Sequence, residues 1–170
     1  MDLDRYIRDI PDFPRPGILF KDITPLLASP VAFHHAIHRM VEHYLPQQLD
    51  VVAAAEARGF LFAAPLAMAL NKPLVPLRKP GKLPYQTHKQ QYDLEYGSAE
   101  LHVHIDGFAP AAAVLLVDDV LATGGTLAAA CKLIATAGAK VHSCAVLAEL
   151  AFLGGREKLA PHEVFTLLRY

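Results

Sequence analysis

The sequence predicts an α/β protein in which a mostly parallel sheet is flanked by helices. Short apolar runs, typical of fully buried strands, alternate along the chain with segments of helical periodicity. Strands that alternate with helices in this way form parallel sheets covered on both faces. The length of 170 residues and the hydrophobic content of 53% are sufficient for one substantial core. We therefore expect a single domain over residues 1–170.

The first 50 residues combine helical and extended patterns. Apolar residues at helical spacing predict a helix over 3–10, which the proline-rich segment 11–17 must end because proline lacks an N–H group. An extended piece is expected over 18–24. A serine–proline pair then begins the next helix, over 30–45, as a capping residue followed by proline in the first turn.

The elements after residue 50 follow a regular alternation of apolar strands and helices. Strands are expected at 51–55, 74–77, 101–105, 113–117, 141–147 and 164–168. Helices are expected at 60–70 and 124–137, the second of them closed by a glycine at its end. The polar segment 78–91, rich in lysine, proline and glycine, is expected to be a mobile loop.

Charge and hydropathy exclude several classes of protein. The net charge is −1 and no lysine or arginine run stands out, which argues against a nucleic-acid partner. The longest apolar stretch, 59–70, is interrupted by proline and is too short to span a bilayer. The first ten residues do not resemble a signal peptide, and Cys131 and Cys144 are interpreted as small buried hydrophobic residues in a reducing compartment. We expect a soluble, cytoplasmic protein without a membrane partner.

The most informative segment is 114–126, with the sequence VLLVDDVLATGGT. An apolar strand leads to Asp118 and Asp119, and a loop of threonine and glycine follows before a helix begins. Ligands of open α/β sheets bind beyond the carboxyl ends of the strands, and a helix N-terminus with free N–H groups suits a phosphate. The loop matches neither GxxxxGK[ST] nor GxGxxG. The two carboxylates would repel a phosphate but suit sugar hydroxyls, directly or through a bound cation, so a sugar phosphate satisfies both features.

This segment resembles the phosphoribosyl-pyrophosphate signature of the type I phosphoribosyltransferases. Further segments are similar to the adenine phosphoribosyltransferases of that family and follow in the family's order: 11–27 (PDFPRPGILFKDITPLL), 56–62 (EARGFLF), 78–84 (RKPGKLP), 92–97 (YDLEYG) and 153–159 (LGGREKL). The resemblance implies the type I fold, with a small hood over 1–28, a core over 30–170 and a mobile catalytic loop over 78–97. It also implies a magnesium-dependent homodimer that converts adenine and phosphoribosyl pyrophosphate into AMP and pyrophosphate in purine salvage.

The resemblance further implies roles for the residues of the signature segment. Asp118 and Asp119 would bind the ribose hydroxyls, and they would reach Mg²⁺, held mainly by the substrate, only through water. The 5′-phosphate would lie in a loop of Ala122, Thr123, Gly124, Gly125 and Thr126.

Other matched segments supply the pyrophosphate, base and proton-transfer roles. By resemblance, Glu56, Ala57 and Arg58 form a pyrophosphate loop with a cis peptide expected between Glu56 and Ala57. Arg58 offers the donor fork that phosphate oxygens need. The further implied pyrophosphate ligands are Arg78, Lys79 and Lys82, and the implied adenine site is Leu19, Phe20 and Lys21, with Phe20 stacked on the base. The implied catalytic residues are Arg58, Glu95, which would handle a proton at purine N7, and Tyr96, which would help to fix the closed loop.

Two departures and two alternatives remain open at the level of sequence. Ala54 stands where the family commonly has glycine, and 85–91 matches no pattern to which a role can be assigned. One alternative is a phosphoribosyltransferase for a 6-oxopurine, although the match at 11–27 favours adenine. The other is a non-catalytic regulator that senses phosphoribosyl pyrophosphate. The absence of a spare domain or basic patch, and the presence of Arg58, Glu95 and Tyr96, favour an enzyme.

Overall fold

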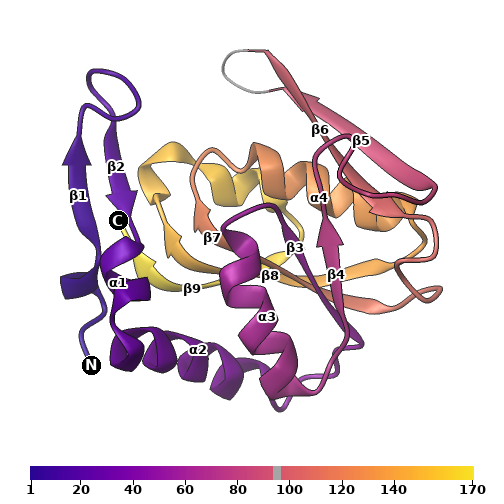
Figure 1. Ribbon diagram of the computed structural model, residues 1–170, viewed down its shortest axis with the longest axis horizontal. Coiled ribbons are helices and arrows are strands. Elements are labelled where there is room, and N and C mark those ends of the chain that lie inside the picture. The colour runs from indigo at the N-terminus through magenta and orange to yellow at the C-terminus, as the bar shows by residue number, and fades with distance from the viewer. Residues whose placement is uncertain (94–96) are drawn as a thin grey trace.

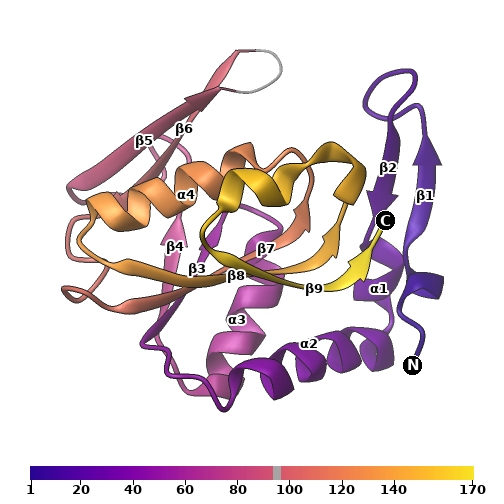
Figure 2. The same cartoon turned by 180° about the vertical axis from the view of Figure 1, so that it is seen from behind.

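The structure, a computed structural model, describes residues 1–93 and 97–170. Its centre is a five-stranded parallel sheet in the order β4-β3-β7-β8-β9 (Figure 1). In chain order its strands are Val51–Ala55 (β3), Leu74–Leu77 (β4), Ala113–Leu121 (β7), Lys140–Glu149 (β8) and Glu163–Arg169 (β9). Helices α2 (Pro30–Tyr44) and α3 (Gly59–Leu70) cover one face, and α4 (Gly125–Thr136) covers the other (Figure 2). The predicted fold class is confirmed.

The central strands are recognisable from sequence because both of their faces are buried. Successive side chains of a strand point to opposite faces. In β7, Val114 and Leu116 therefore pack in the core beneath α4, whereas Leu115 and Val117 pack in the core formed with α2 and α3. All five residues of β3 are buried as well. A strand with two buried faces reads as a continuous apolar run, and the sequence has such runs at these positions.

Two antiparallel hairpins flank the sheet. The N-terminal hairpin pairs β1 (Arg8–Pro11) with β2 (Leu19–Asp22), and the second hairpin pairs β5 (Thr87–Asp93) with β6 (Ser98–His104). Both views show them at opposite ends of the molecule, rising on the same side of the sheet (Figures 1 and 2). They border the edge of the sheet at which the signature segment lies.

Two of the predicted elements were wrong. The expected helix over 3–10 is only a 3-10 turn, Asp4–Tyr6, because Arg8–Pro11 instead pairs with β2 as a strand. Part of the expected loop 78–91 is strand β5, which pairs with β6 along its whole length. The short helix α1 (Thr24–Ala28) and the 3-10 turns Ala151–Leu153 and Gly155–Leu159 were not expected.

The remaining predicted helices and strands are confirmed with small shifts of their ends. The largest shift is in β7, which continues through Asp118 and Asp119 to Leu121 instead of ending before them. Cys131 and Cys144 are both buried free thiols, with their sulfur atoms 3.9 Å apart. Within residues 1–93 and 97–170, none of the helices combines the length and the apolarity that crossing a membrane requires.

Candidate active site

A cavity of about 290 Å³ lies beyond the carboxyl ends of β3 and β7. Because parallel strands end at the same edge of a sheet, two segments far apart in sequence meet there. The cavity is lined by Glu56, Ala57, Arg58, Leu127 and all residues from Asp118 to Thr126. The structure therefore brings together the two segments to which the resemblance assigns ribose, phosphate and pyrophosphate.

The loop before α4 is shaped by two glycines in backbone contact. Gly124 has a φ of +79°, and a Cβ on it would lie 2.5 Å from the carbonyl oxygen of Gly155. A Cβ on Gly155 would in turn lie 2.1 Å from the oxygen of Ala122. Only glycine allows this approach, so the 3-10 turn at 155–159 supports the loop from behind. The free N–H groups at the start of α4 face the cavity and suit a phosphate.

The two aspartates differ in their surroundings. Asp119 is buried and Asp118 is half-buried, and the Asp118 carboxylate accepts a hydrogen bond from the Asp119 amide over 2.9 Å. Arg58 Nε lies 2.8 Å from Asp119 Oδ2 as an ion pair. Among the described residues, no donor is aligned to make a hydrogen bond with this buried oxygen. This oxygen is therefore held by the charge of Arg58 without an aligned hydrogen bond from the described part of the chain.

Burial and charge shift the titration of this carboxylate pair. Burial raises the pKa of Asp118 to about 8, and the neighbouring Asp119 carboxylate acts in the same direction. Burial also raises the pKa of Asp119, although the positive charge of Arg58 opposes that shift. Two crowded carboxylates without enough donors are an environment that hydroxyl-rich or cationic ligands relieve.

The loop between β3 and α3 is held close to the aspartates. The peptide bond between Glu56 and Ala57 is cis, as predicted. A Cβ on Gly59 would lie 2.9 Å from the Val117 carbonyl oxygen and 3.0 Å from Asp118 Oδ1, so this glycine lets the first turn of α3 rest against β7. Ala54, where the family commonly has glycine, is fully buried and pairs with Val117 and Pro76 within the sheet.

The other basic residues assigned to pyrophosphate lie outside the lining of this cavity. Glu56 Oε2 accepts hydrogen bonds from Arg78 Nε and from the Lys79 amide, each over 2.8 Å. Burial works in the opposite direction, but these two bonds lower the pKa of Glu56. Glu56 therefore anchors Arg78 and also lines the first cavity. Lys79 and Lys82 have exposed side chains on the surface turn that follows.

A second cavity, of about 430 Å³, adjoins the first. The two share Arg58, Val120, Ala122 and Thr123. The second is otherwise lined by residues 17–21 of the N-terminal hairpin and by Leu150, Phe152 and Leu153. Leu19, Phe20 and Lys21 lie together on one wall, as the resemblance implied. The opposite wall was missed from sequence, although it borders the matched segment 153–159. We call this second space the base cavity.

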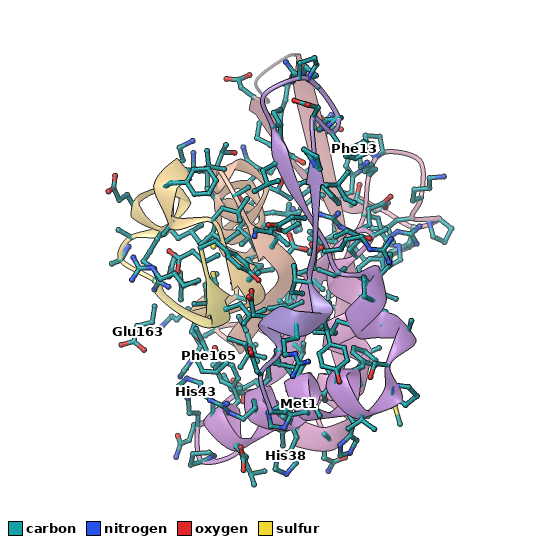
Figure 3. The ribbon with its side chains drawn as sticks, turned by 90° about the vertical axis from the view of Figure 1, so that its left-hand side faces the viewer. Met1, Phe13, His38, His43, Glu163 and Phe165 are labelled. Atoms are coloured by element: carbon teal, nitrogen blue, oxygen red, sulfur yellow. The ribbon has the colours of Figure 1, made fainter. Side chains whose placement is uncertain are left out.

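Phe20 connects the base cavity to the arginine of the first cavity. The Arg58 guanidinium carbon lies 5.5 Å from the centre of the Phe20 ring, within the range of a cation–π contact. Phe13 packs edge-on against Phe20 with a centroid distance of 5.1 Å, from its place at the far end of the hairpin (Figure 3). An aromatic ring and a guanidinium thus face the junction of a polar and a largely apolar space.

The second hairpin reaches the loop before α4. Thr126 Oγ1 donates to Tyr92 Oη over 3.5 Å, and Tyr92 also packs against the core beneath α4. Glu95 and Tyr96, which the resemblance assigns to catalysis, lie outside the described residues. The chemistry available from the described residues is therefore binding and charge stabilisation. A sugar phosphate fits the first cavity, and a planar ring fits the second.

Comparison with known proteins shows similarity to phosphoribosyltransferases over nearly the whole chain. Residues 22–163 match the model of the phosphoribosyl transferase domain. The adenine phosphoribosyltransferase of Thermobifida fusca is 56% identical, over 97% of this chain and 94% of the relative. That of Rhodopirellula baltica is 54% identical, over 100% of this chain and 82% of the relative.

Solved structures agree with the sequence relatives. The adenine phosphoribosyltransferase of Thermoanaerobacter pseudethanolicus superposes with a TM-score of 0.96 at 46% identity, covering 99% of this chain and 98% of the other. The Saccharomyces cerevisiae enzyme, solved with an imino-altritol bisphosphate and adenine, superposes with a TM-score of 0.91 at 38% identity, covering 98% and 96%. With its fold, its two adjoining cavities and these relatives, the chain belongs to the phosphoribosyltransferase family and, within it, to the adenine phosphoribosyltransferases.

Proposed function

We propose that the chain transfers the 5-phosphoribosyl group from phosphoribosyl pyrophosphate to adenine, releasing AMP and pyrophosphate. The observation that carries this proposal is the junction of the two cavities at Arg58, Val120, Ala122 and Thr123. A ribose phosphate in the first cavity would place its C1 carbon toward a base in the second. The curated relatives that share this chain's full length carry the same activity in their names.

The reaction breaks the bond between ribose C1 and the pyrophosphate oxygen and forms a bond from C1 to adenine N9. Positive charge builds on the ribose and negative charge on the leaving group. Asp118 and Asp119 hold the ribose hydroxyls and keep C1 aligned with the base. The loop from Ala122 to Thr126 holds the 5′-phosphate. Arg58, which adjoins both cavities, leaves its ion pair with Asp119 and stabilises the departing pyrophosphate.

Magnesium is the cation proposed for this site. The oxygen-rich donors of the first cavity, including the buried Asp119 Oδ2 without a hydrogen bond among the described residues, fit an ion that retains several waters. Asp118 and Asp119 would contact it through water. When bound with the substrate, Mg²⁺ neutralises charge on the pyrophosphate oxygens.

The proton on the purine and the closure of the site involve the segment around residue 95. We propose that Glu95 manages the proton at adenine N7 and that Tyr96 steadies the closed loop, which excludes water from the activated sugar. Glu95→Gln should lower kcat by about 10²–10⁴-fold, because the amide cannot accept a proton. Single-turnover kinetics isolate the chemical step, and a normal rate there would remove Glu95 from the mechanism.

The substrate is tested by parallel assays. With magnesium and phosphoribosyl pyrophosphate present, adenine, hypoxanthine and guanine are offered separately and nucleotide formation is followed. AMP from adenine alone supports the proposal. Turnover of hypoxanthine or guanine instead would support the proposed reaction but would show that adenine is not the base. Tight binding of phosphoribosyl pyrophosphate without turnover of any base would favour the sensing regulator.

We also propose that the chain works as a homodimer through the outer face of α3. This helix carries no charged residue, yet Met68 is 84% exposed and Leu61 is 44% exposed. A helix that is apolar all round is normally buried on every side. The exposed face continues onto Leu74 of the edge strand β4, across a cavity of about 520 Å³. A second copy would cover it and would lie beside the Glu56–Arg58 loop, which runs directly into α3.

The dimer and the position of its interface on α3 are tested together. Sedimentation of the wild-type protein should give twice the mass of the chain, and Met68→Lys should shift it toward the monomer. A wild-type monomer at micromolar concentration would overturn the proposal.

The compartment proposed is the cytoplasm, in which the unlinked Cys131 and Cys144 thiols would remain reduced.

A further inference from the structure

Tyr170 contacts both walls of the base cavity. Its backbone continues the pairing of β9 with β8, since the Tyr170 amide donates to the Glu149 carbonyl over 2.9 Å. The Ala151 amide then donates to the Tyr170 carbonyl over 2.8 Å. Ala151 lies between Leu150 and Phe152, which line one wall of the cavity. The backbone of Tyr170 thus fixes the chain at the base of that wall.

The side chain of Tyr170 reaches the opposite wall. Lys21, which lines the cavity from the N-terminal hairpin, places its Nζ 3.8 Å from the centre of the Tyr170 ring. The same ammonium is paired with Asp9 Oδ1 at 2.6 Å, and the Lys21 side chain is only 12% exposed. Tyr170 Oη donates to Asp4 Oδ1 over 2.6 Å. Both ribbon views place this end of the chain beside β2 (Figures 1 and 2).

A two-stranded hairpin is marginally stable by itself and depends on its contacts with the rest of the protein. Hydrogen bonds to a charged group and cation–π contacts that are partly shielded from water are among the stronger contacts available to it. Tyr170 supplies one of each from a backbone already fixed to the sheet: the cation–π contact is to Lys21 of the hairpin, and the hydrogen bond is to Asp4 of the 3-10 turn that leads into the hairpin. The Tyr170 side chain therefore links the N-terminal hairpin to the segment that carries Leu150, Phe152 and Leu153.

We propose that Tyr170 is a positioning residue for the base: it sets the width of the base cavity by fastening the N-terminal hairpin to the segment after β8. The inference rests on the proposed placement of adenine in that cavity. The hairpin meets the first cavity at Arg58, whose guanidinium lies against Phe20, but the loop and the aspartates of that cavity are held elsewhere. Its loop is supported by Gly155 and its aspartates belong to β7, both within the main body of the protein. Loosening the hairpin should therefore weaken the binding of the base and leave the binding of phosphoribosyl pyrophosphate unchanged.

Steady-state kinetics with two variants test this separation. Tyr170→Leu removes both the ring and the hydroxyl, whereas Tyr170→Phe keeps the ring over Lys21 and removes only the bond to Asp4. The expected result is a rise in the KM for adenine of about tenfold for Tyr170→Leu and about threefold for Tyr170→Phe. The KM for phosphoribosyl pyrophosphate and kcat at saturating adenine should stay within about twofold of wild type.

Thr166→Val is the matched control. Thr166 is on β9, the strand that leads into Tyr170, and its hydroxyl donates to the Leu168 carbonyl over 2.7 Å, so this variant also removes a hydroxyl contact. It should leave the KM for adenine unchanged. A similar rise in the control, or equal losses for both substrates in the Tyr170 variants, would reduce Tyr170 to a structural role and overturn the inference. An unchanged KM for adenine in Tyr170→Leu would overturn it as well.

Two further measurements keep the test decisive. If Tyr170→Leu does not fold, Asp4→Asn and Tyr170→Phe each perturb only the hydrogen bond, and the double variant should raise the KM for adenine no further than Tyr170→Phe alone. Additive effects would contradict the proposed contact. Phe20→Leu tests the adenine site separately. If Phe20→Leu leaves the KM for adenine unchanged, the base placement fails, whatever the Tyr170 variants do.

Discussion

At the scale of single residues, the site concentrates opposing charges before any substrate binds. Asp118 and Asp119 lie side by side, and Arg58 is paired with one of them at 2.8 Å. Phosphoribosyl pyrophosphate offers hydroxyls to the carboxylates and phosphate oxygens to the arginine. In the proposed complex, binding would exchange an internal ion pair for contacts of both kinds with one ligand. In the ligand-free protein the raised pKa of Asp118, about 8, reduces the repulsion between the two side chains because Asp118 keeps its proton at neutral pH.

Asp118→Asn should raise the stability of the ligand-free protein while it weakens the binding of phosphoribosyl pyrophosphate. The folded protein holds the Asp118 proton to about pH 8, whereas the unfolded chain releases it near the ordinary value of 3.8. Unfolding thus releases a proton between these values, and the contribution of Asp118 to stability declines as pH rises through this window. The asparagine variant lacks this decline. Above pH 7 its Tm, measured without ligand, should exceed that of wild type by a few degrees, roughly 2–8 °C.

The same variant should bind phosphoribosyl pyrophosphate poorly, and combining it with Asp119→Asn should abolish detectable binding in calorimetry. An amide replaces a carboxylate that accepts ribose hydroxyls, and the charge-assisted bonds are lost. Ligand-free stability that falls with pH as in wild type would contradict the raised pKa of Asp118. Unchanged affinity in the double variant would remove the pair from the ribose site.

At the scale of elements, the loop from Ala122 to Thr126, which is proposed to bind the phosphate, depends on a backbone contact that sequence spacing does not reveal. Gly124 is 31 residues before Gly155, and their close approach is visible only once the 3-10 turn at 155–159 is folded against the loop. The motif TGGT predicts a phosphate loop from local chemistry. The second glycine pair in LGGR has no local explanation, because its partner is distant in sequence.

Gly124→Ala should damage the loop far more than Gly138→Ala, although both glycines adopt positive φ values, at the start and just beyond the end of α4. Each alanine costs about 1–2 kcal/mol for the left-handed conformation. Only at Gly124 does the new Cβ meet another backbone, whereas at Gly138 nothing lies within 4 Å. We expect affinity for phosphoribosyl pyrophosphate to fall by at least about tenfold in Gly124→Ala and to stay near wild type in Gly138→Ala. Calorimetry measures the affinity for phosphoribosyl pyrophosphate, and thermal unfolding measures the loss of stability. Equal affinities of Gly124→Ala and Gly138→Ala would show that the contact with Gly155 does not shape the loop.

The same scale explains which elements sequence predicts well. Strands β3, β7 and β8 are buried on both faces, and their apolar runs leave little ambiguity. Strand β5 is polar and half-exposed, and among residues 1–93 and 97–170 its only strand partner is β6, so its sequence resembles a loop. In the N-terminal hairpin, eight residues were too few to separate helical from strand periodicity. The wall formed by Leu150, Phe152 and Leu153 was missed because a 3-10 turn has no strong sequence signal.

At the scale of the whole molecule, the binding site and the proposed dimer face share one helix. The loop Glu56–Arg58 runs directly into α3, and Gly59 fixes the first turn of that helix against Asp118. The outer face of the same helix carries the exposed Leu61 and Met68. A partner covering this face would hold α3 in place from outside while β7 holds it from inside. If the proposed dimer and pyrophosphate site are correct, subunit contact and pyrophosphate binding would be mechanically linked.

Met68→Lys should consequently affect catalysis as well as assembly. If the variant is monomeric, its α3 is held from one side only, and the KM for phosphoribosyl pyrophosphate should rise by about three- to tenfold, the factor expected for a loss of ~1 kcal/mol of positioning. The KM for adenine should change less, because the base cavity is built mainly from the N-terminal hairpin and the segment after β8.

Val31→Lys supplies the control for an added surface charge. Val31 is an apolar residue of α2 and is 64% exposed, so the substitution places a lysine on another helix while leaving the α3 face intact. It should remain dimeric with wild-type kinetics. A monomeric Met68→Lys variant with an unchanged KM for phosphoribosyl pyrophosphate would show that dimer formation does not affect binding at the site. The pyrophosphate loop would then be held by Gly59 and the Glu56–Arg78 pair alone, and the partner would contribute stability without affecting binding.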